Sequence, residues 1–220
     1  MAGMLITMEG VDGSGKTTQM ERLAARLGRL GVPAAVSKEP GGTPLCQDLR
    51  ALLLTPHPSG ETWVPMAELL LFYADRAQHI ARFIRPMLVA GRVVLLDRFD
   101  DSTRAYQGAQ GVADGVLDRL GAAVLDGLEP DLTVILDLDP AASQARAGAR
   151  NAAHGAFRET RFDEETQAFH QRVRALFLDL AAREPGRMAV VPAAGPADQV
   201  EASVWARVAP RLAAAGHRTE

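Results

Sequence analysis

Gly10-Val11-Asp12-Gly13-Ser14-Gly15-Lys16-Thr17 is the most informative segment of this chain. It fits the pattern G-x-x-x-x-G-K-[ST], and it stands between an apolar run that reads as a strand, Leu5–Met8, and a helical pattern, Thr17–Leu30. A strand, a glycine-rich loop and a helix in this order form a P-loop, in which backbone N–H groups and the helix N-terminus hold a polyphosphate. The chain is therefore expected to bind a nucleoside triphosphate.

The residue types in the loop suit phosphate chemistry. Lys16 is expected to reach the β- and γ-phosphates of ATP, and the hydroxyl of Thr17 to ligate Mg²⁺. The predicted ATP-binding residues are Gly10, Val11, Asp12, Gly13, Ser14, Gly15, Lys16, Thr17 and Thr18. Asp97 ends the apolar run Val93–Leu96, and a carboxylate at the end of a buried strand either caps the next turn or holds a metal, usually through water. Arg98 follows it and is expected to point into the same crevice.

Apolar runs and helical patterns alternate along the rest of the chain. The further predicted strands are Ala34–Ser37, Val93–Asp97, Leu132–Leu138 and Met188–Val191. Helices are predicted to start at Thr43-Pro44, Pro65, Asp139-Pro140 and Asp163, and a last one to cover Ala197–Ala214. This alternation predicts an α/β fold with a mainly parallel sheet, which binds its ligands at the carboxyl ends of the strands.

Composition narrows the class of protein. The chain has 220 residues, of which 47% are hydrophobic and 23% charged, and its formal net charge of −3 argues against a protein that coats nucleic acid. A single cysteine, Cys46, excludes a disulfide framework and is expected to be a small buried apolar residue. No apolar run approaches the ~18 residues of a membrane span, and no signal-peptide pattern stands at the N-terminus, which favours a cytoplasmic protein.

The P-loop alone leaves several classes of protein open. A GTPase switch needs Asn-Lys-x-Asp to read guanine, and the one asparagine of the chain, Asn151, is followed by alanine. An ATP-driven binding module, such as a partition or transport ATPase, needs a group that positions water and a partner surface, and neither is evident. A small-molecule kinase needs a second substrate pocket and cations that close over the phosphates, and the chain offers candidates for both.

The P-loop and four further motifs together resemble the pattern of a known family. They are GVDGSGKTT at 10–18, EPGGT at 39–43, LFYADR at 71–76, DRF at 97–99 and STRAYQG at 102–108. In order and spacing they resemble the thymidylate kinase family. The resemblance implies one P-loop nucleoside monophosphate kinase domain over 1–220, with a five-stranded parallel sheet flanked by helices and a mobile lid. It also implies transfer of the γ-phosphoryl group of ATP to dTMP, with Mg²⁺, by a homodimer; a kinase for another nucleoside monophosphate is the alternative.

The acceptor site is predicted from the residues and from the resemblance together. Phe72 and Arg76 stand four residues apart on one predicted helix, so they share a face that offers a base both a stacking ring and a donor. In the family's pattern these two contact thymine, Thr103 bonds the base edge and Tyr106 lies under the sugar. The expected dTMP-binding residues are Asp12, Glu39, Arg50, Phe72, Arg76, Arg98, Thr103, Tyr106 and Gln107.

The remaining catalytic charge is expected from a lid at about 146–161, which holds Arg146, Arg150, Arg158 and Arg161. Gly13 stands where one branch of the family has a catalytic arginine, so a lid arginine would fill that role, as in the bacterial branch. The expected catalytic residues are Lys16, Arg98, Arg150 and Arg158. Pro192–Pro196 is expected to line the adenine pocket. Phe99 departs from the tyrosine or histidine that the family usually has after Asp-Arg.

Overall fold

A parallel β-sheet forms the centre of the molecule in the computed structural model, which describes residues 3–143 and 165–220. Its described strands stand in the order β2-β3-β1-β4-β5, so the P-loop strand lies in the middle. The strands are β1 (Met4–Glu9), β2 (Ala34–Lys38), β3 (Val93–Asp97), β4 (Leu132–Asp137) and β5 (Met188–Pro192). All four neighbouring pairs are parallel. The five predicted strands are confirmed to within a residue or two at their ends.

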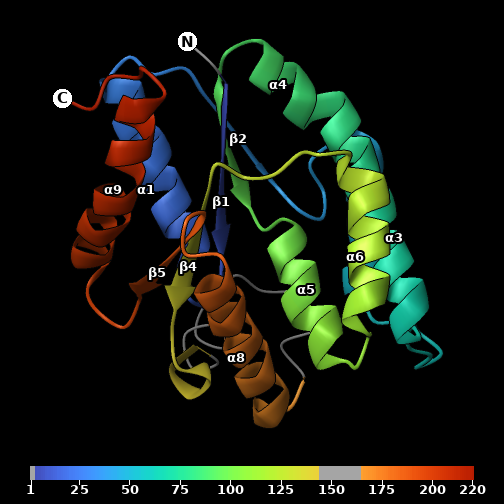
Figure 1. Ribbon diagram of the computed structural model, residues 1–220. Coiled ribbons are helices and arrows are strands. Elements are labelled where there is room, and N and C mark those ends of the chain that lie inside the picture. Colours follow the sequence, from blue (N-terminus) through green and yellow to red (C-terminus); the bar gives the residue numbers. More distant parts are fainter. Residues whose placement is uncertain (1–2, 144–164) are drawn as a thin grey trace.

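Helices follow the strands and cover both faces of the sheet (Figure 1). They are α1 (Lys16–Arg29), α2 (Pro44–Leu54), α3 (Pro65–His79), a π-helical turn η1 (Ile80–Ile84), α4 (Arg85–Val89), α5 (Asp100–Ala109), α6 (Asp114–Leu125), α8 (Gln167–Arg183) and α9 (Ala197–Ala214). Helices α1 and α9 lie on one face, and α5, α6 and α8 lie on the other. None of the helices in the described ranges is long and apolar enough to span a membrane.

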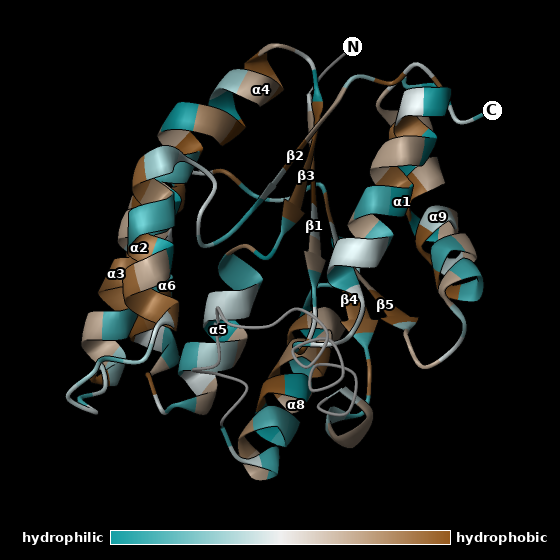
Figure 2. Cartoon of the chain, turned by 180° about the vertical axis from the view of Figure 1, so that it is seen from behind, coloured by the Kyte–Doolittle hydropathy of each residue, from teal (hydrophilic) through white to brown (hydrophobic). Residues whose placement is uncertain are grey.

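Side chains along β1 alternate between the two faces of the sheet and pack against the helices on each face. Ile6 and Met8 point to the α1 and α9 side, where they pack in a core with Leu23 of α1 and Val204 of α9. Leu5 points to the opposite face and joins the cluster under η1. The strands themselves are coloured mostly as hydrophobic, whereas the helices carry mixed faces (Figure 2). A sheet buried on both sides explains why its strands read as continuous apolar runs.

The predicted helix starts agree with the structure where it describes them. Thr43 caps α2 by accepting a hydrogen bond from the Cys46 N–H at 3.3 Å, and Pro44 takes the first helical position. Pro65 begins α3, and a helical turn begins at Pro140. The start predicted at Asp163 lies outside the described residues; α8 begins at Gln167. Helices α5 and α6 were not among the predicted elements, and both flank the site described next.

Candidate active site

The loop between β1 and α1 has the close backbone approach that a phosphate cradle needs. Gly10 adopts φ 131°, and a Cβ built there would lie 2.5 Å from the carbonyl oxygen of Leu136, so this position requires glycine. Lys16 is the first residue of α1, and its Nζ donates to the carbonyl oxygens of Gly10 at 3.2 Å and Val11 at 3.1 Å. A polyphosphate at the N-terminus of α1 would meet this ammonium group together with backbone N–H groups.

The two predicted metal ligands are adjacent. The Thr17 hydroxyl donates to Oδ2 of Asp97 at 3.2 Å, although the two residues come from α1 and from the end of β3. A hydroxyl and a carboxylate at the mouth of a phosphate loop form a hard-oxygen donor set, which suits Mg²⁺. Because Mg²⁺ keeps several waters and takes phosphate oxygens, one or two protein ligands are sufficient. The residues present therefore fit this ion.

Arg98 lies between the loop and the rest of the site. Its backbone has φ 71°, a left-handed conformation that side chains other than glycine adopt infrequently. The guanidinium donates to Asp12 Oδ1 at 2.6 Å, to the Tyr106 hydroxyl at 3.2 Å and to the carbonyl oxygen of Gly10 at 3.0 Å. Burial opposes ionisation of Asp12, but the charge of Arg98 outweighs it and holds the pKa of this carboxyl below its usual range. Asp12 is thus an ionised carboxylate in the folded protein.

Glu9 is a site residue that the sequence analysis missed. It ends β1 with no exposed surface; its Oε1 accepts the Phe99 N–H at 2.7 Å, and its Oε2 accepts from the Ser102 hydroxyl. These two bonds hold the segment that directly follows the strained Arg98. Burial, and then the charge of Asp101, raise the pKa of Glu9 to about 8. The signal was present, because Glu9 ends an apolar run directly before the P-loop, as Asp97 ends the run before Arg98.

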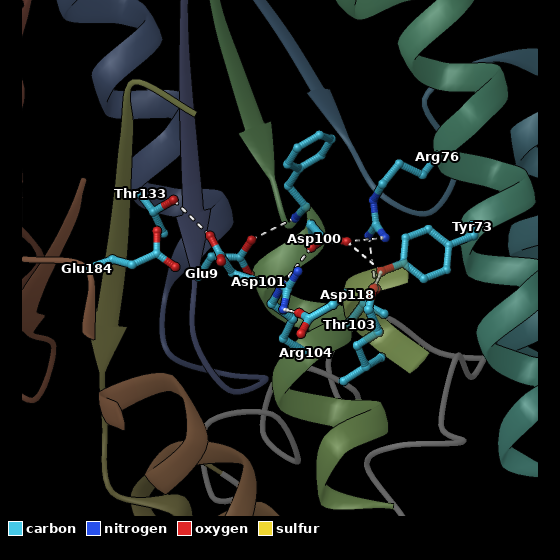
Figure 3. Close-up of polar contacts among 12 residues, drawn as sticks. Glu9, Tyr73, Arg76, Asp100, Asp101, Thr103, Arg104, Asp118, Thr133 and Glu184 are labelled. Atoms are coloured by element: carbon cyan, nitrogen blue, oxygen red, sulfur yellow. Dashed lines mark hydrogen bonds and ion pairs between the residues drawn. The ribbon is translucent and has the colours of Figure 1, made fainter. Parts of the chain in front are cut away.

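A second group of side chains gathers where α3 meets α5 (Figure 3). Arg76 of α3 is 2% exposed, and its guanidinium donates through Nε to Glu39 at 2.9 Å, through Nη1 to Asp100 at 3.2 Å and through Nη2 to Thr103 at 3.0 Å. Phe72 lies one helical turn before Arg76, and both line the same cleft. The arrangement gives an aromatic ring beside a guanidinium that is fixed in place, which is suited to a planar base carrying acceptor oxygens.

The loop after β2 supports this group from behind. His79 is fully buried, and its ring nitrogens are hydrogen bonded to the Ser37 hydroxyl at 2.8 Å and to Glu39 at 3.0 Å. Gly42 lies directly against this ring, since a Cβ built at Gly42 would come 2.1 Å from His79 Nε2. Asp75 accepts the Gly41 N–H at 3.0 Å, and burial, and then the charge of Glu39, raise its pKa to about 6. The EPGG segment is therefore held by buried polar side chains of α3.

Two further predicted acceptor residues have partners within the protein. Arg50 of α2 donates to the carbonyl oxygen of Pro40 at 2.7 Å, which directs its side chain over the EPGG loop. The Gln107 amide donates to Oε1 of Glu68 at 2.7 Å. Glu68 is fully buried in α3, and the sequence analysis did not single it out. Both predicted residues line the cleft, Arg50 near the loop and Gln107 on α5.

One cleft of about 1200 Å³ brings these groups together at the carboxyl ends of the strands. That exceeds the volume of most single-ligand pockets, about 300–1,000 Å³, and leaves room for two nucleotides. Among the predicted ATP-binding residues, those from Asp12 to Thr18 line the cleft, while Gly10 and Val11 are not among its lining residues. All the predicted dTMP-binding residues line it, namely Asp12, Glu39, Arg50, Phe72, Arg76, Arg98, Thr103, Tyr106 and Gln107.

The segment after β5 also contributes to the wall of the cleft. Ala193 and Gly195, from the stretch predicted to line the adenine pocket, do line the cleft. Gln19 of α1, which the sequence analysis missed, donates through Nε2 to the carbonyl oxygen of Ala197 at 3.0 Å and so ties this segment to the P-loop helix. The predicted lid, about 146–161, and its candidate catalytic residues Arg150 and Arg158 lie outside the described residues.

Comparisons with known proteins agree with this geometry. A family model described as thymidylate kinase matches residues 8–204. The thymidylate kinase of Solidesulfovibrio magneticus is 52% identical over 204 residues, which are 92% of this chain and 97% of that protein. The thymidylate kinase of Deinococcus radiodurans is 45% identical over 210 residues, 95% of this chain and 98% of that protein. The crystal structure of thymidylate kinase from Ehrlichia chaffeensis aligns with a TM-score of 0.76 at 33% identity, covering 94% of this chain and 100% of that one.

These matches decide between the classes that the P-loop left open. The alternative of an ATP-driven binding module is wrong, because the similarity extends well beyond the P-loop to nearly the whole chain. The solved relative has the same fold, a P-loop nucleoside monophosphate kinase with a parallel sheet between helices. With a family model across most of its length and relatives that it matches almost end to end, the chain belongs to the thymidylate kinase family.

Proposed function

We propose that the cleft carries out the family's reaction with the residues described above. The reaction follows from family membership: the γ-phosphoryl group of ATP is transferred to dTMP, giving dTDP and ADP. The observation that carries the assignment of residues is the position of Arg98. It reaches Asp12 in the P-loop and Tyr106 on α5, so it stands between a phosphate cradle and a base pocket. A group transferred between two nucleotides would pass beside this guanidinium.

Charge neutralisation is the main catalytic task, because the phosphoryl transition state is loose and needs no covalent intermediate. Lys16 is proposed to contact the β- and γ-phosphates of ATP from the N-terminus of α1. Arg98, with Arg50, is proposed to hold the acceptor phosphate, which the planar fork of a guanidinium binds bidentately. Arg150 and Arg158 are proposed to supply the remaining positive charge; this part of the assignment rests on the sequence alone.

Thr17 and Asp97 are proposed to hold Mg²⁺, the carboxylate through water. When bound, the ion would neutralise charge on the β- and γ-phosphate oxygens. The hydrogen bond between the two side chains supports this proposal, because it brings a hydroxyl of α1 and a carboxylate of β3 to one point beside the loop.

The acceptor is proposed to bind between α3 and α5. Phe72 would stack on the thymine ring, and Arg76 and Thr103 would bond its edge. Tyr106 would lie under the deoxyribose, where its ring would crowd a 2′-hydroxyl, and Asp12 would accept a hydrogen bond from the 3′-hydroxyl. Tyr106 is 5% exposed and its hydroxyl donates to Asp12 Oδ2 at 3.1 Å, so both sugar contacts come from one rigid unit.

We also infer that the chain works as a homodimer through α2 and α3. These helices and the loop between them expose a set of large apolar side chains: Leu45, Leu52, Trp63, Val64, Met66 and Leu70. Monomers seldom leave such a group uncovered. Replacement of Leu52 and Leu70 by glutamate is expected to convert a dimer into monomers in light scattering; a wild-type chain that is monomeric at micromolar concentration would contradict the inference.

The test of the acceptor assignment is a coupled assay of ADP release with a panel of monophosphates: dTMP, dUMP, dCMP, dGMP and TMP with ribose. We expect the highest kcat/KM with dTMP and no release without Mg²⁺. Equal kcat/KM for a purine monophosphate would contradict the pyrimidine pocket. Activity that persists in EDTA would contradict the metal assignment and leave the pocket untouched.

A further inference from the structure

The side chains that hold Arg76 differ in their relation to the cleft. Glu39 and Thr103 line the cleft beside Arg76, whereas Asp100 does not line it and is 6% exposed. Asp100 is the first residue of α5, where the helix dipole favours a negative charge. Its contribution to the acceptor pocket therefore passes through another residue.

Both oxygens of Asp100 are engaged (Figure 3). Oδ1 accepts from the Tyr73 hydroxyl at 2.9 Å and from Arg76 Nη1 at 3.2 Å, and Oδ2 accepts from Arg104 Nε at 2.9 Å. Arg104 in turn donates through Nη1 to Oδ1 of Asp118, on α6, at 2.7 Å. Charges thus alternate along one line, from Arg76 in the interior to Asp118, whose side chain is 62% exposed.

The partners of Asp100 do not depend on it equally. Tyr73 has a second acceptor, the carbonyl oxygen of Leu117 at 3.3 Å, and Arg104 has Asp118. Arg76 also bonds Glu39 and Thr103, but it does so through Nε and Nη2, whereas Asp100 is the acceptor that faces Nη1. This contact lies inside the protein, where loss of an ionic hydrogen bond costs more than at the surface. Removal of the carboxylate would therefore affect Arg76 most.

The geometry also says what a fixed Arg76 achieves. Three of the five N–H groups of its guanidinium are used by Glu39, Asp100 and Thr103, and because these acceptors bond three different nitrogens, they fix the plane of the group. The N–H groups that are left can only donate. A base with an oxygen at position 4, such as thymine, accepts from them, whereas a base with an amino group there, such as cytosine, brings donor against donor.

We propose that Asp100 is a positioning residue for the acceptor pocket: it fixes the guanidinium of Arg76 in the orientation that favours dTMP over dCMP. The proposal rests on the proposed function, in which Arg76 reads the base. If Arg76 could turn away, the repulsion against an amino group would be relieved and discrimination would fall. The carboxylate of Asp100 opposes that turn from outside the cleft, in addition to Glu39 and Thr103 inside it.

Asp100→Asn is the variant that tests this. An amide has one acceptor and one donor end, so in either orientation an N–H faces Arg104 or the Tyr73–Arg76 pair. We expect the KM for dTMP to rise about 10-fold, the scale of one charge-assisted hydrogen bond, with kcat and the KM for ATP changed less than about 2-fold. The ratio of kcat/KM for dTMP to that for dCMP is expected to fall about 10-fold. Asp118→Asn, the same chemical change at the exposed end, should leave all of these at wild-type values.

A double-mutant cycle with Arg76→Met shows whether Asp100 acts through Arg76. Asp100→Asn should have no further effect on dTMP kinetics when Arg76 is already methionine. An additional loss in the double mutant, or an equal rise of both KM values in Asp100→Asn alone, would assign Asp100 a purely structural role and overturn the proposal.

The same variants also distinguish a failure of the proposed base pocket from a failure of the positioning role of Asp100. If Arg76→Met leaves the KM for dTMP unchanged, the proposed base pocket is wrong; if it raises that KM while Asp100→Asn does not, the positioning role alone is wrong. Should Asp100→Asn fail to fold, Arg104→Gln releases Asp100 from its other side at a residue that is 27% exposed. The dTMP-to-dCMP ratio should then fall about 2- to 3-fold, and an unchanged ratio would overturn the proposal.

Discussion

The donor and acceptor halves of the cleft are built in opposite ways. The P-loop is local in sequence and made of backbone: Lys16 donates to carbonyl oxygens five and six residues before it. The base pocket is made of buried side-chain ion pairs, and it collects Glu39, Arg76 and Asp100 from three separate segments. The first can be recognised from eight consecutive letters, whereas the second exists only after the chain has folded.

This contrast gives the two halves different sensitivities. A glycine-rich cradle presents the same N–H groups whatever the neighbouring side chains are, so its function depends on few residues. A buried ionic network depends on every member, because removal of one leaves another charge unpaired in the interior. Mutations should therefore affect catalysis most strongly through Lys16 in the donor half, and selectivity through several residues in the acceptor half.

The largest effect is expected at Lys16. Lys16→Ala removes the cation of the P-loop, and kcat should fall at least about 10²- to 10³-fold, the range for loss of a preorganised charge-stabilising donor. The Kd for dTMP should stay close to the wild-type value, as measured by titration calorimetry. Arg29→Ala changes an exposed residue of the same helix and serves as the control. Wild-type turnover in the Lys16 variant would remove the basis for the donor half.

In the acceptor half, Phe72 is expected to have the next largest effect. Phe72→Ala removes a base–aromatic contact worth roughly 1–3 kcal/mol, so the KM for dTMP should rise about 5- to 150-fold. The KM for ATP serves as the internal control and should stay nearly unchanged in the same steady-state assay. A similar rise for both substrates would mean that Phe72 is a packing residue common to both halves.

Tyr106 separates the roles of a ring and a hydroxyl. The ring packs edge-on against Phe169 and Phe177, and the hydroxyl bonds Asp12. Tyr106→Ala should lower the preference for deoxyribose over ribose and also lower the melting temperature, because it leaves a cavity in the core. Tyr106→Phe keeps the ring and should keep the sugar preference, measured as a ratio of kcat/KM values. A change of that ratio in Tyr106→Phe would assign the selection to the hydroxyl.

The smallest effect is expected for Glu9, whose protonation should change the free energy of unfolding with pH. Its pKa is raised from 4.5 to about 8, so the folded protein holds this proton more tightly than the unfolded chain, and stability is lost as the pH rises through this window. Relative to Glu9→Gln, the wild type should lose at least about 1.4 kcal/mol of unfolding free energy across the window, the equivalent of one pKa unit. Urea denaturation at both ends of the window measures this, with the exposed Glu61→Gln as the control. Parallel pH dependences in wild type and Glu9→Gln would contradict the shift.

The strands were predictable because a parallel sheet buried on both faces leaves an uninterrupted apolar run, as in Val93–Leu96. Helix α5 was not predicted, for a physical reason. Its buried positions include Asp100, Asp101 and Thr103, so the apolar period that reveals a helix is absent where the helix carries the site. The pairing around Arg76 was not predicted for a different reason. Its partners Glu39 and Asp100 stand 37 and 24 residues away in the sequence, and such separations leave no local pattern.

The absence of a side chain at Gly42 limits how the acceptor pocket can be redesigned. His79 is fully buried and is held by Ser37 and Glu39, so a methyl group placed 2.1 Å from its ring would force the ring to shift against these bonds. The ring would have to move, Glu39 would follow, and Glu39 holds Arg76. A single carbon atom added at position 42 would thus displace Arg76, the group proposed to read the base, through His79 and Glu39. Libraries aimed at new acceptor bases should leave position 42 unchanged and vary the residues that touch the base.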